Sequence, residues 1–164
     1  YQAGTKNLKY TFMHSMNFKN QPDTIVVIDP EMKYDMVVNT LPQVVVKDLK
    51  IYKGQHNILP ADCPQGMLKV RIDGITKTKD VQVRVTQDGK SKTLNVQNID
   101  DVQRYIVGTY DIEVLTLPRI YFDDVHIKQS EHAYLEIPGS GLLQYRASKS
   151  IVGQIFLLND KDER

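Results

Sequence analysis

One stretch of this sequence occurs twice, and this duplication limits the possible folds more than any other feature does. Residues 34–59 align without a gap on residues 110–135, at an offset of 110 − 34 = 76 positions. Ten of the 26 aligned residues are identical, whereas roughly one in sixteen would match between unrelated chains of average composition. The sequence therefore predicts two copies of one structural unit. The identical pairs are Tyr34/Tyr110, Asp35/Asp111, Val38/Val114, Thr40/Thr116, Leu41/Leu117, Pro42/Pro118, Asp48/Asp124, Ile51/Ile127, His56/His132 and Leu59/Leu135.

The similarity continues past this stretch with a small change of register. Residues 66–71 match residues 141–146 at an offset of 75, one position less than before. Such a difference places a loop between two matched segments, because loops tolerate insertions and deletions. We expect a first unit over residues 1–98 and a second over 99–164 that lacks its own closing strand. Residues 1–13 resemble such a strand, which would either end a preceding unit or complete the first one.

Side-chain alternation within the copies predicts β-strands. Tyr34, Met36 and Val38 share one face of an extended chain while Asp35 lies on the other, and the second copy repeats this pattern. Proline lacks the amide hydrogen that a ladder needs, so the Leu-Pro dipeptide of each copy indicates the exit of a strand or a sheet edge.

The second copy also contains a change of phase. Ile120 and Phe122 are apolar in one phase of the alternation, and Val125 and Ile127 are apolar in the other. A strand with a period of two cannot change phase unaided. The sequence therefore predicts a bulge at residues 123–124, or a strand that crosses from one sheet to the other.

The remaining local patterns also favour strands. Asp88-Gly89 is typical of a tight hairpin turn between two β-patterned runs. Turn residues precede the expected strands at 67–72 and 142–145, and residues 100–105 are the best place for one short turn of helix. Short strands at this spacing predict an all-β chain of two tandem β-sandwich units, transthyretin-like or immunoglobulin-like, related by the internal repeat. Packing between such small units is expected to add to their stability.

Composition excludes several classes of function. The 21 Lys and Arg residues nearly balance the 20 Asp and Glu residues, so the charge pattern does not indicate a nucleic-acid partner. The longest apolar runs are far shorter than the roughly 20 residues of a membrane-spanning helix, and we expect no membrane insertion. Cys63 is the single cysteine, so an internal disulfide and a cysteine-based metal cluster are excluded.

The repeated polar residues are the candidate binding or structural positions. We interpret the two histidines as residues at a strand start or turn, since each unit offers only one histidine at this position and no cysteine lies near it. The repeated aspartates are explained by capping or turn hydrogen bonds, because two acids in separate units do not make a catalytic pair. We assign no catalytic, cofactor-binding or metal-binding residue and no cofactor, and do not expect an enzyme. The six positions are Tyr34, Asp35, His56, Tyr110, Asp111 and His132.

With these motifs in place, the chain resembles the β-rich region carboxy-terminal to the von Willebrand factor A-type domain in large exported proteins of Bacteroidetes-type bacteria. The resemblance rests on YDxxVxTLP in both copies, H-N-I at 56–58, P-Q-G-x-L at 64–68 and NLKYTF at 7–12. The stretch G-T-Y-D-I-E-V at 108–114 is also similar to transthyretin-like and PEGA-type surface modules. The resemblance implies a periplasmic, outer-membrane-associated or extracellular location. It does not carry over a metal site, since the Asp-x-Ser-x-Ser motif of the A-type domain does not occur in this sequence.

The sequence is compatible with three functions. The first is a non-catalytic structural or interaction module that spaces or presents a neighbouring domain, with that domain or another protein as its partner. The alternative is a carbohydrate-binding module, because exposed aromatic rings pack against sugars and Tyr1, Tyr52, Tyr121 and Tyr145 are available. A metal-dependent hydrolase is supported only by the repeated Asp and His residues.

Overall fold

The computed structural model describes residues 1–21, 26–74, 80–139, 141, 144 and 146–156. The described residues are all-β and contain three sheets, which confirms the predicted class. Among them, none forms a helix long and apolar enough to cross a bilayer. The strands are β1 (Tyr34–Val38), β2 (Val44–Leu49), β3 (Gln65–Ile72), β4 (Gln82–Gln87), β5 (Thr93–Asn98), β6 (Val102–Ile106), β7 (Gly108–Val114), β8 (Ile120–Ile127) and β9 (His132–Ile137).

Two of the sheets enclose the main core. One has the strand order β6-β3-β9 and the other β5-β4-β7-β8. Alternate residues of these strands point inward, as the period of two requires, and Leu68, Val85, Tyr105, Ile112 and Ile137 are almost completely buried together. The side chains come from both sheets, so the two sheets pack face to face as in a β-sandwich.

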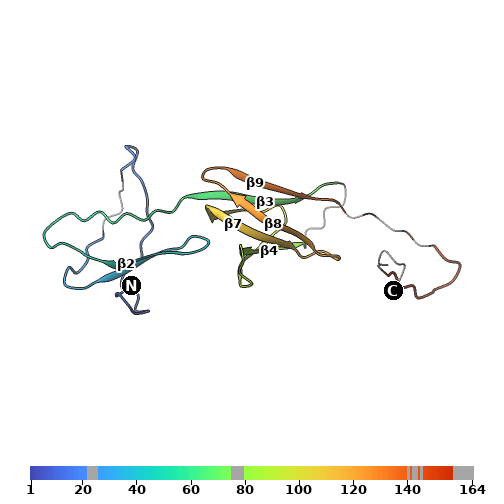
Figure 1. Cartoon of the computed structure of the whole chain (residues 1–164), viewed down its shortest axis with the longest axis horizontal. Helices are drawn as coiled ribbons and strands as arrows, with labels where there is room; N and C mark the ends of the chain where they lie inside the picture. Colours follow the sequence, from blue (N-terminus) through green and yellow to red (C-terminus); the bar gives the residue numbers. More distant parts are fainter. Residues whose placement is uncertain (22–25, 75–79, 140, 142–143, 145, 157–164) are drawn as a thin grey trace.

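The third sheet is the hairpin β1–β2, whose strands pair only with each other among the described strands. It lies at one end of the sandwich, and the chain after β9 leaves at the opposite end (Figure 1). Residues 1–13, all of them described, have no strand of their own. Gln2 makes one isolated bridge to Tyr34, and the amide of Asp35 donates to the carbonyl of Tyr1 at 2.9 Å.

The sandwich combines strands from both sides of position 98. Strand β3 pairs in parallel with β9, and β4 pairs antiparallel with β7. The strands that surround the described core therefore run from residue 65 to residue 137 and continue across the expected boundary between 98 and 99. The repeat period gives the length of one unit but not the residue at which the unit begins. The period alone therefore does not locate the boundary of a folded unit.

Several local predictions are confirmed. Both Leu-Pro dipeptides lie in the loop between paired strands, and the predicted bulge is present, since Tyr110 pairs with Val125 whereas Ile112 pairs with Phe122. Asp123 and Asp124 thus lie opposite the single residue Asp111. Strands β4 and β5 form the hairpin predicted around Asp88-Gly89, and β3 includes the strand predicted at 67–72.

One local prediction is wrong, and one lies outside the described residues. Residues 100–105 were expected to hold a short turn of helix, but β6 begins at Val102 and pairs antiparallel with β3. Its side chains alternate, with Tyr105 fully buried in the core. This buried contact determines the conformation more strongly than the weak local preference. The strand predicted at 142–145 lies largely outside the described residues.

Candidate functional site

The duplicated residues form two hairpins with the same tip. Hairpin β1–β2 turns at Leu41-Pro42 and hairpin β7–β8 turns at Leu117-Pro118, and both peptide bonds are cis. The preceding threonine holds each tip: its hydroxyl donates to the proline carbonyl at 2.7 Å in both hairpins. Its amide donates to the carbonyl of the last valine of the strand at 2.9 Å in both. We call these two turns the Leu-Pro tips.

Each hairpin also contains the same bulge, held by an aspartate pair. Asp48 and Asp124 both have a φ of 55°, a left-handed conformation that aspartate tolerates better than most residues. A bulge leaves one amide without its ladder partner. The carboxylates of Asp35 and Asp111 accept these amides, at 3.0 Å from Asp48 and 3.3 Å from Asp124. The first carboxylate also accepts the amide of Gly4 at 2.9 Å.

These amide hydrogen bonds affect the acidity of Asp35. The bond from the Asp48 amide and then the bond from the Gly4 amide hold the pKa of the Asp35 carboxyl below its ordinary value. Backbone N–H groups stabilise the ionised carboxylate. The repeated aspartates named in the sequence thus have local hydrogen-bonding roles in the described structure.

The matched tyrosines lie near the start of the first strand of each hairpin and are both buried. Tyr34 and Tyr110 are 3% and 2% exposed. Each hydroxyl donates to a backbone carbonyl a few residues upstream, that of Asp29 at 2.9 Å and that of Ile106 at 2.6 Å. Burial raises the pKa of each phenol to about 12. A tyrosine bonded back to upstream backbone resembles the tyrosine corner of Greek-key sandwiches.

The matched histidines lie on the surface in different settings. His56 is exposed in the chain between β2 and β3, whereas His132 is the exposed first residue of β9. The ring of His132 is parallel to that of Tyr134, with the two centroids 5.5 Å apart. The six predicted positions are therefore distributed over both hairpins, β9 and a loop, and in the described structure they do not converge on one cleft.

Three carboxylates do approach one another on the sandwich. One oxygen from each of Asp88, Asp111 and Asp124 lies within 4.8 Å of the other two. Asp88 comes from the turn between β4 and β5, and the other two come from the bulge of β7–β8. Carboxylate oxygens are the ligands that Ca²⁺ prefers, so these are the described residues with a geometry suited to a cation. Sequence spacing did not group Asp88 with the other two, because only the pairing of β4 with β7 brings its turn beside them.

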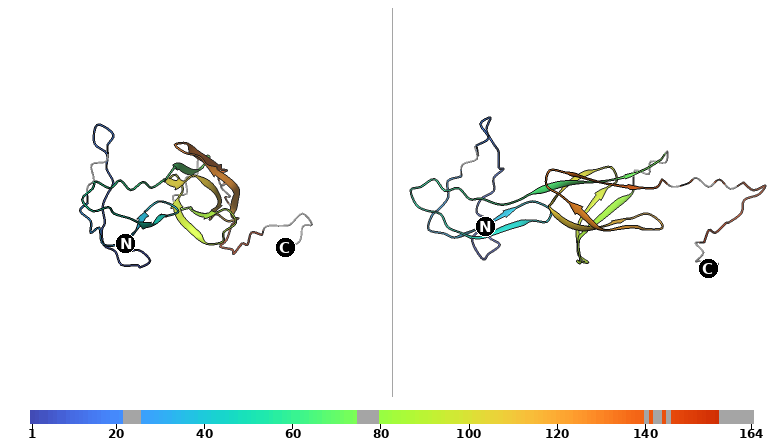
Figure 2. Two further views of the ribbon diagram at one scale, coloured as in Figure 1. Left: turned by 60° about the vertical axis from the view of Figure 1, so that its left-hand side comes forward. Right: turned by 45° about the horizontal axis from the view of Figure 1, so that its top comes forward.

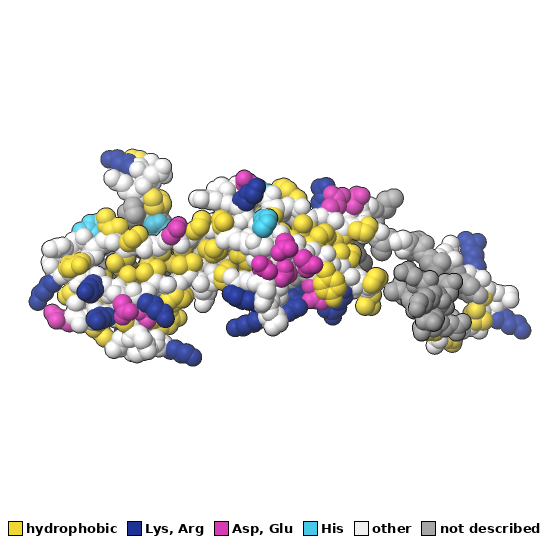
Figure 3. All heavy atoms as spheres, viewed as in Figure 1, with side chains coloured by type: hydrophobic (Ala, Val, Ile, Leu, Met, Phe, Trp, Pro, Cys, Tyr) yellow, Lys and Arg dark blue, Asp and Glu magenta, His cyan; other side chains and the backbone are white. Residues whose placement is uncertain are grey.

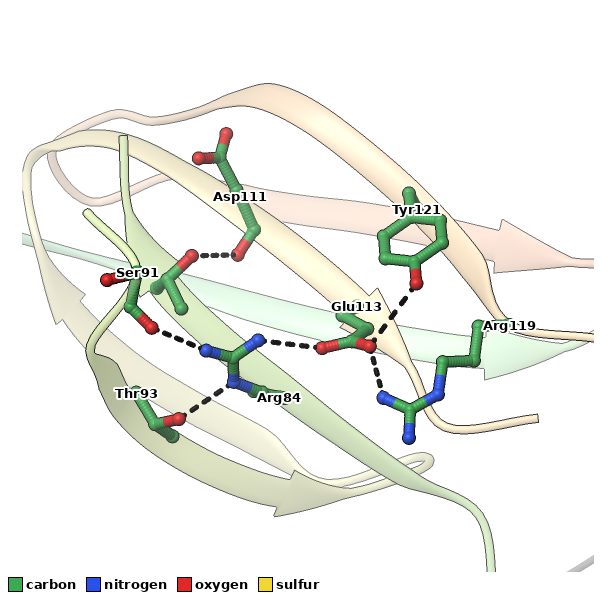
Figure 4. A network of polar contacts seen from close by, with 8 residues as sticks. Arg84, Ser91, Thr93, Asp111, Glu113, Arg119 and Tyr121 are labelled. Carbon is green, nitrogen blue, oxygen red and sulfur yellow. Dashed lines mark hydrogen bonds and ion pairs between the residues drawn. The ribbon is translucent and has the colours of Figure 1, made fainter. Parts of the chain in front are cut away.

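A second polar cluster was not found from sequence. Glu113 on β7 accepts a hydrogen bond from Arg84 on β4 at 2.8 Å and another from Arg119 beyond the hairpin tip. Arg84 also donates to Thr93 at 2.7 Å and to the carbonyl of Ser91 at 2.6 Å (Figure 4). These contacts join β4, β5, β7 and the turn before β8. The only sequence signal for this cluster is the presence of opposite charges on strands that become neighbours. That signal can be used only when the register of the two strands is known.

Glu113 predicts a dependence of stability on pH. Hydrogen bonds from Arg84 and then Arg119 lower the pKa of its carboxyl below the ordinary value. A depressed folded-state pKa gives stability that is present above the unfolded-state pKa of about 4.3 and is lost as the pH falls through the folded-state pKa. We expect Glu113→Gln to lower the thermal midpoint at pH 7 by a few degrees, and this difference to shrink below about pH 4.

Glu136→Gln is the matched control for that measurement. Glu136 pairs with Arg71 across β9 and β3 at 2.7 Å, but both side chains are about half exposed, and exposed ion pairs contribute little. Its thermal midpoint should stay near that of the unchanged protein at both pH values. A Glu113→Gln deficit equally large at pH 7 and pH 3 would contradict the ionic role of Glu113.

The tyrosines proposed for sugar binding are on separate elements. Tyr1 is 36% exposed, and its amino group donates to the carbonyl of Asp35 on β1. Tyr52 is 62% exposed in the chain after β2, and Tyr121 is 62% exposed on β8. Tyr145 lies outside the described residues. Figure 3 shows apolar side chains spread along the elongated body rather than gathered over one hollow on this face.

Neither protein-family models, nor curated proteins, nor solved structures match this chain.

Proposed function

We propose that this chain is a non-catalytic structural and interaction module of a larger exported or cell-surface bacterial protein. In this proposal, tandem copies of one β-sandwich space or present a neighbouring domain. The support for tandem copies is the shared geometry of the two hairpins, namely the Leu-Pro tip, the aspartate bulge and the buried tyrosine. The location and the parent protein follow from the resemblance to the region beyond the A-type domain, with neighbouring domains of the same parent chain as partners.

The observation that carries the spacing role is the arrangement of the first and last strands of the sandwich. Strands β3 and β9 are adjacent and parallel, paired from Met67 with His132 to Ile72 with Ile137. Tension between the start of β3 and the end of β9 therefore acts along the strands. It loads the ladder bonds together in shear, instead of opening them one after another. Such a geometry suits a module that holds its neighbours apart.

Pulling the protein in two directions tests this role. Force applied between Cys63, just before β3, and a cysteine at Pro138→Cys, just after β9, loads the β3–β9 ladder in shear. Force applied between Cys63 and Gln129→Cys, just before β9, peels the same ladder from one end. We expect a higher unfolding force for the first pair in single-molecule measurements, since forced unfolding reports the unfolding barrier. Equal forces for the two pairs would contradict a role in bearing load.

Carbohydrate binding is the second candidate, and the exposure of Tyr52 and Tyr121 favours it. An exposed ring offers an apolar face that a sugar ring covers. Titration with oligosaccharides at millimolar concentration, followed by nuclear magnetic resonance, should then shift the signals of these rings. An unchanged spectrum across a panel of neutral and acidic sugars removes this candidate.

A further inference from the structure

The two Leu-Pro tips have the same residues and different surroundings. Leu41 is half-buried and packs against the core of the sandwich. Leu117 occupies the same place in its own tip and is 98% exposed. Pro118 and Thr116 are likewise more exposed than their counterparts in the first tip. The second tip thus presents to solvent the surface that the first tip buries.

The contacts of the first tip show how a Leu-Pro tip binds to the sandwich. The carbonyl of Leu41 accepts the amide of Ile106 at 2.7 Å, at the end of β6. Beside it, the amide of Val107 donates to the carbonyl of Pro64, just before β3. The tip therefore meets the sandwich at the end where the chain enters β3, as the second view in Figure 2 shows. We call this end the entry end.

Both tips are formed in the same way whether or not they are covered. The threonine hydroxyl and amide make the same two bonds, at the same distances, in the docked and the exposed tip. The exposed tip is therefore already in the conformation that docking uses. A preformed element loses little conformational entropy on binding.

The second tip is also placed where a following unit would begin. Strand β7 starts at Gly108, beside the entry end, and runs away from it, so Leu117 lies at the opposite end, where β9 also finishes. The chain from Leu41 to Gly66 covers 66 − 41 = 25 positions, and that from Leu117 to Gly141 covers 141 − 117 = 24. Residues 141–146 match the first strand of the sandwich, residues 66–71.

We propose that the Leu117-Pro118 tip is a docking element that binds the entry end of a following copy of this sandwich, the copy that the match of residues 141–146 to residues 66–71 places after this one. The Leu117 side chain packs against the core of that copy, and its carbonyl accepts an amide at the end of the strand that corresponds to β6. This inference rests on the proposed tandem arrangement and defines the joint between its units. Burial of the leucine side chain is the favourable term.

A chain extended by one copy tests this joint. Residues 1–140 are followed directly by residues 66–164, so that the junction falls at the matched glycines Gly66 and Gly141. In a Cys63→Ser background, Leu117→Cys is introduced in the first copy only. We expect a thiol reagent to modify this cysteine rapidly in the 164-residue chain and more slowly by roughly tenfold or more in the extended chain, because covered groups react through local opening.

Two other cysteines calibrate the measurement. Leu41→Cys, in the tip that is already docked, should react slowly in both chains. Lys90→Cys in the first copy lies in the exposed turn after β4, away from the joint, and should react at one rate in both chains. A second variant, Leu117→Asp, should leave the thermal midpoint of the 164-residue chain unchanged and lower that of the extended chain.

The outcomes separate the joint from the tandem arrangement. Backbone amide signals report whether the added copy folds. If that copy folds while the cysteine at position 117 reacts equally in both chains, the joint is wrong and the tandem arrangement stands. If the added copy does not fold at the matched junction, both the joint and the tandem arrangement are overturned.

Discussion

Gly66→Ala is expected to lower the free energy of unfolding of the sandwich by about 3 kcal/mol or more, at the upper end of the cost of overpacking. A Cβ atom at this position of β3 would lie 2.1 Å from the carbonyl oxygen of Lys128 and 2.7 Å from the Cγ2 atom of Ile127. The first contact is with backbone, which cannot rotate away. Urea unfolding followed by circular dichroism measures the loss.

Gly108→Ala is the control for that substitution. Gly108 also lies in a strand, but its nearest neighbours to an added Cβ are atoms of the Tyr110 side chain at 3.7–3.9 Å. These are ordinary van der Waals distances, so the change should shift stability by less than about 1 kcal/mol. Similar losses for the two variants would show that the contacts around Gly66 are not the cause.

Tyr110→Ala is expected to cost about 3–5 kcal/mol, as other aromatic truncations in cores do. Tyr110 belongs to the sandwich core, with its ring centroid 5.5 Å from that of Tyr105. The change removes both the ring and the hydroxyl bond to the carbonyl of Ile106. Thermal and urea unfolding should both show the loss across the whole sandwich.

Tyr34→Ala is the matched change in the other hairpin. It tests whether hairpin β1–β2 unfolds separately from the sandwich. Tyr34 is as buried as Tyr110, but it packs with Tyr10 at a centroid distance of 5.8 Å and is outside the sandwich core. We expect hydrogen exchange to rise in β1 and β2 while β3 to β9 keep most of their protection. A loss of protection throughout the sandwich would mean that hairpin and sandwich unfold as one cooperative unit.

The features that the sequence predicted correctly are those whose conformation is determined by residues close together in the chain. The phase change around Asp123-Asp124 required either a bulge or a strand that crosses between sheets, and a bulge is present. The Leu-Pro dipeptides were expected at a strand exit or a sheet edge because proline has no amide hydrogen, and both lie in turns after a strand. These features follow from backbone chemistry within a few residues, so a single sequence contains them.

The candidate site depends on contacts between residues that are far apart in the sequence, and these contacts could not be predicted from it. Arg84 and Glu113 are 29 positions apart, and their pairing depends on the register of β4 against β7. Asp88 joins the repeated aspartates for the same reason. The short helix expected at residues 100–105 was wrong because Tyr105 gains more from burial between the sheets than the local pattern indicated.

By itself, the sequence determined the duplication, the strands that begin the matched stretches and the change of phase at residues 123–124, since each results from alternation, proline and hydrogen bonding over short distances. The tertiary structure alone decided which strands share a sheet and where a folded unit begins, because these depend on pairings such as that of β3 with β9. Leu41 and Leu117 illustrate the difference. They have the same sequence context and the same turn, yet one is covered and the other is 98% exposed, because burial depends on what else occupies the surrounding space.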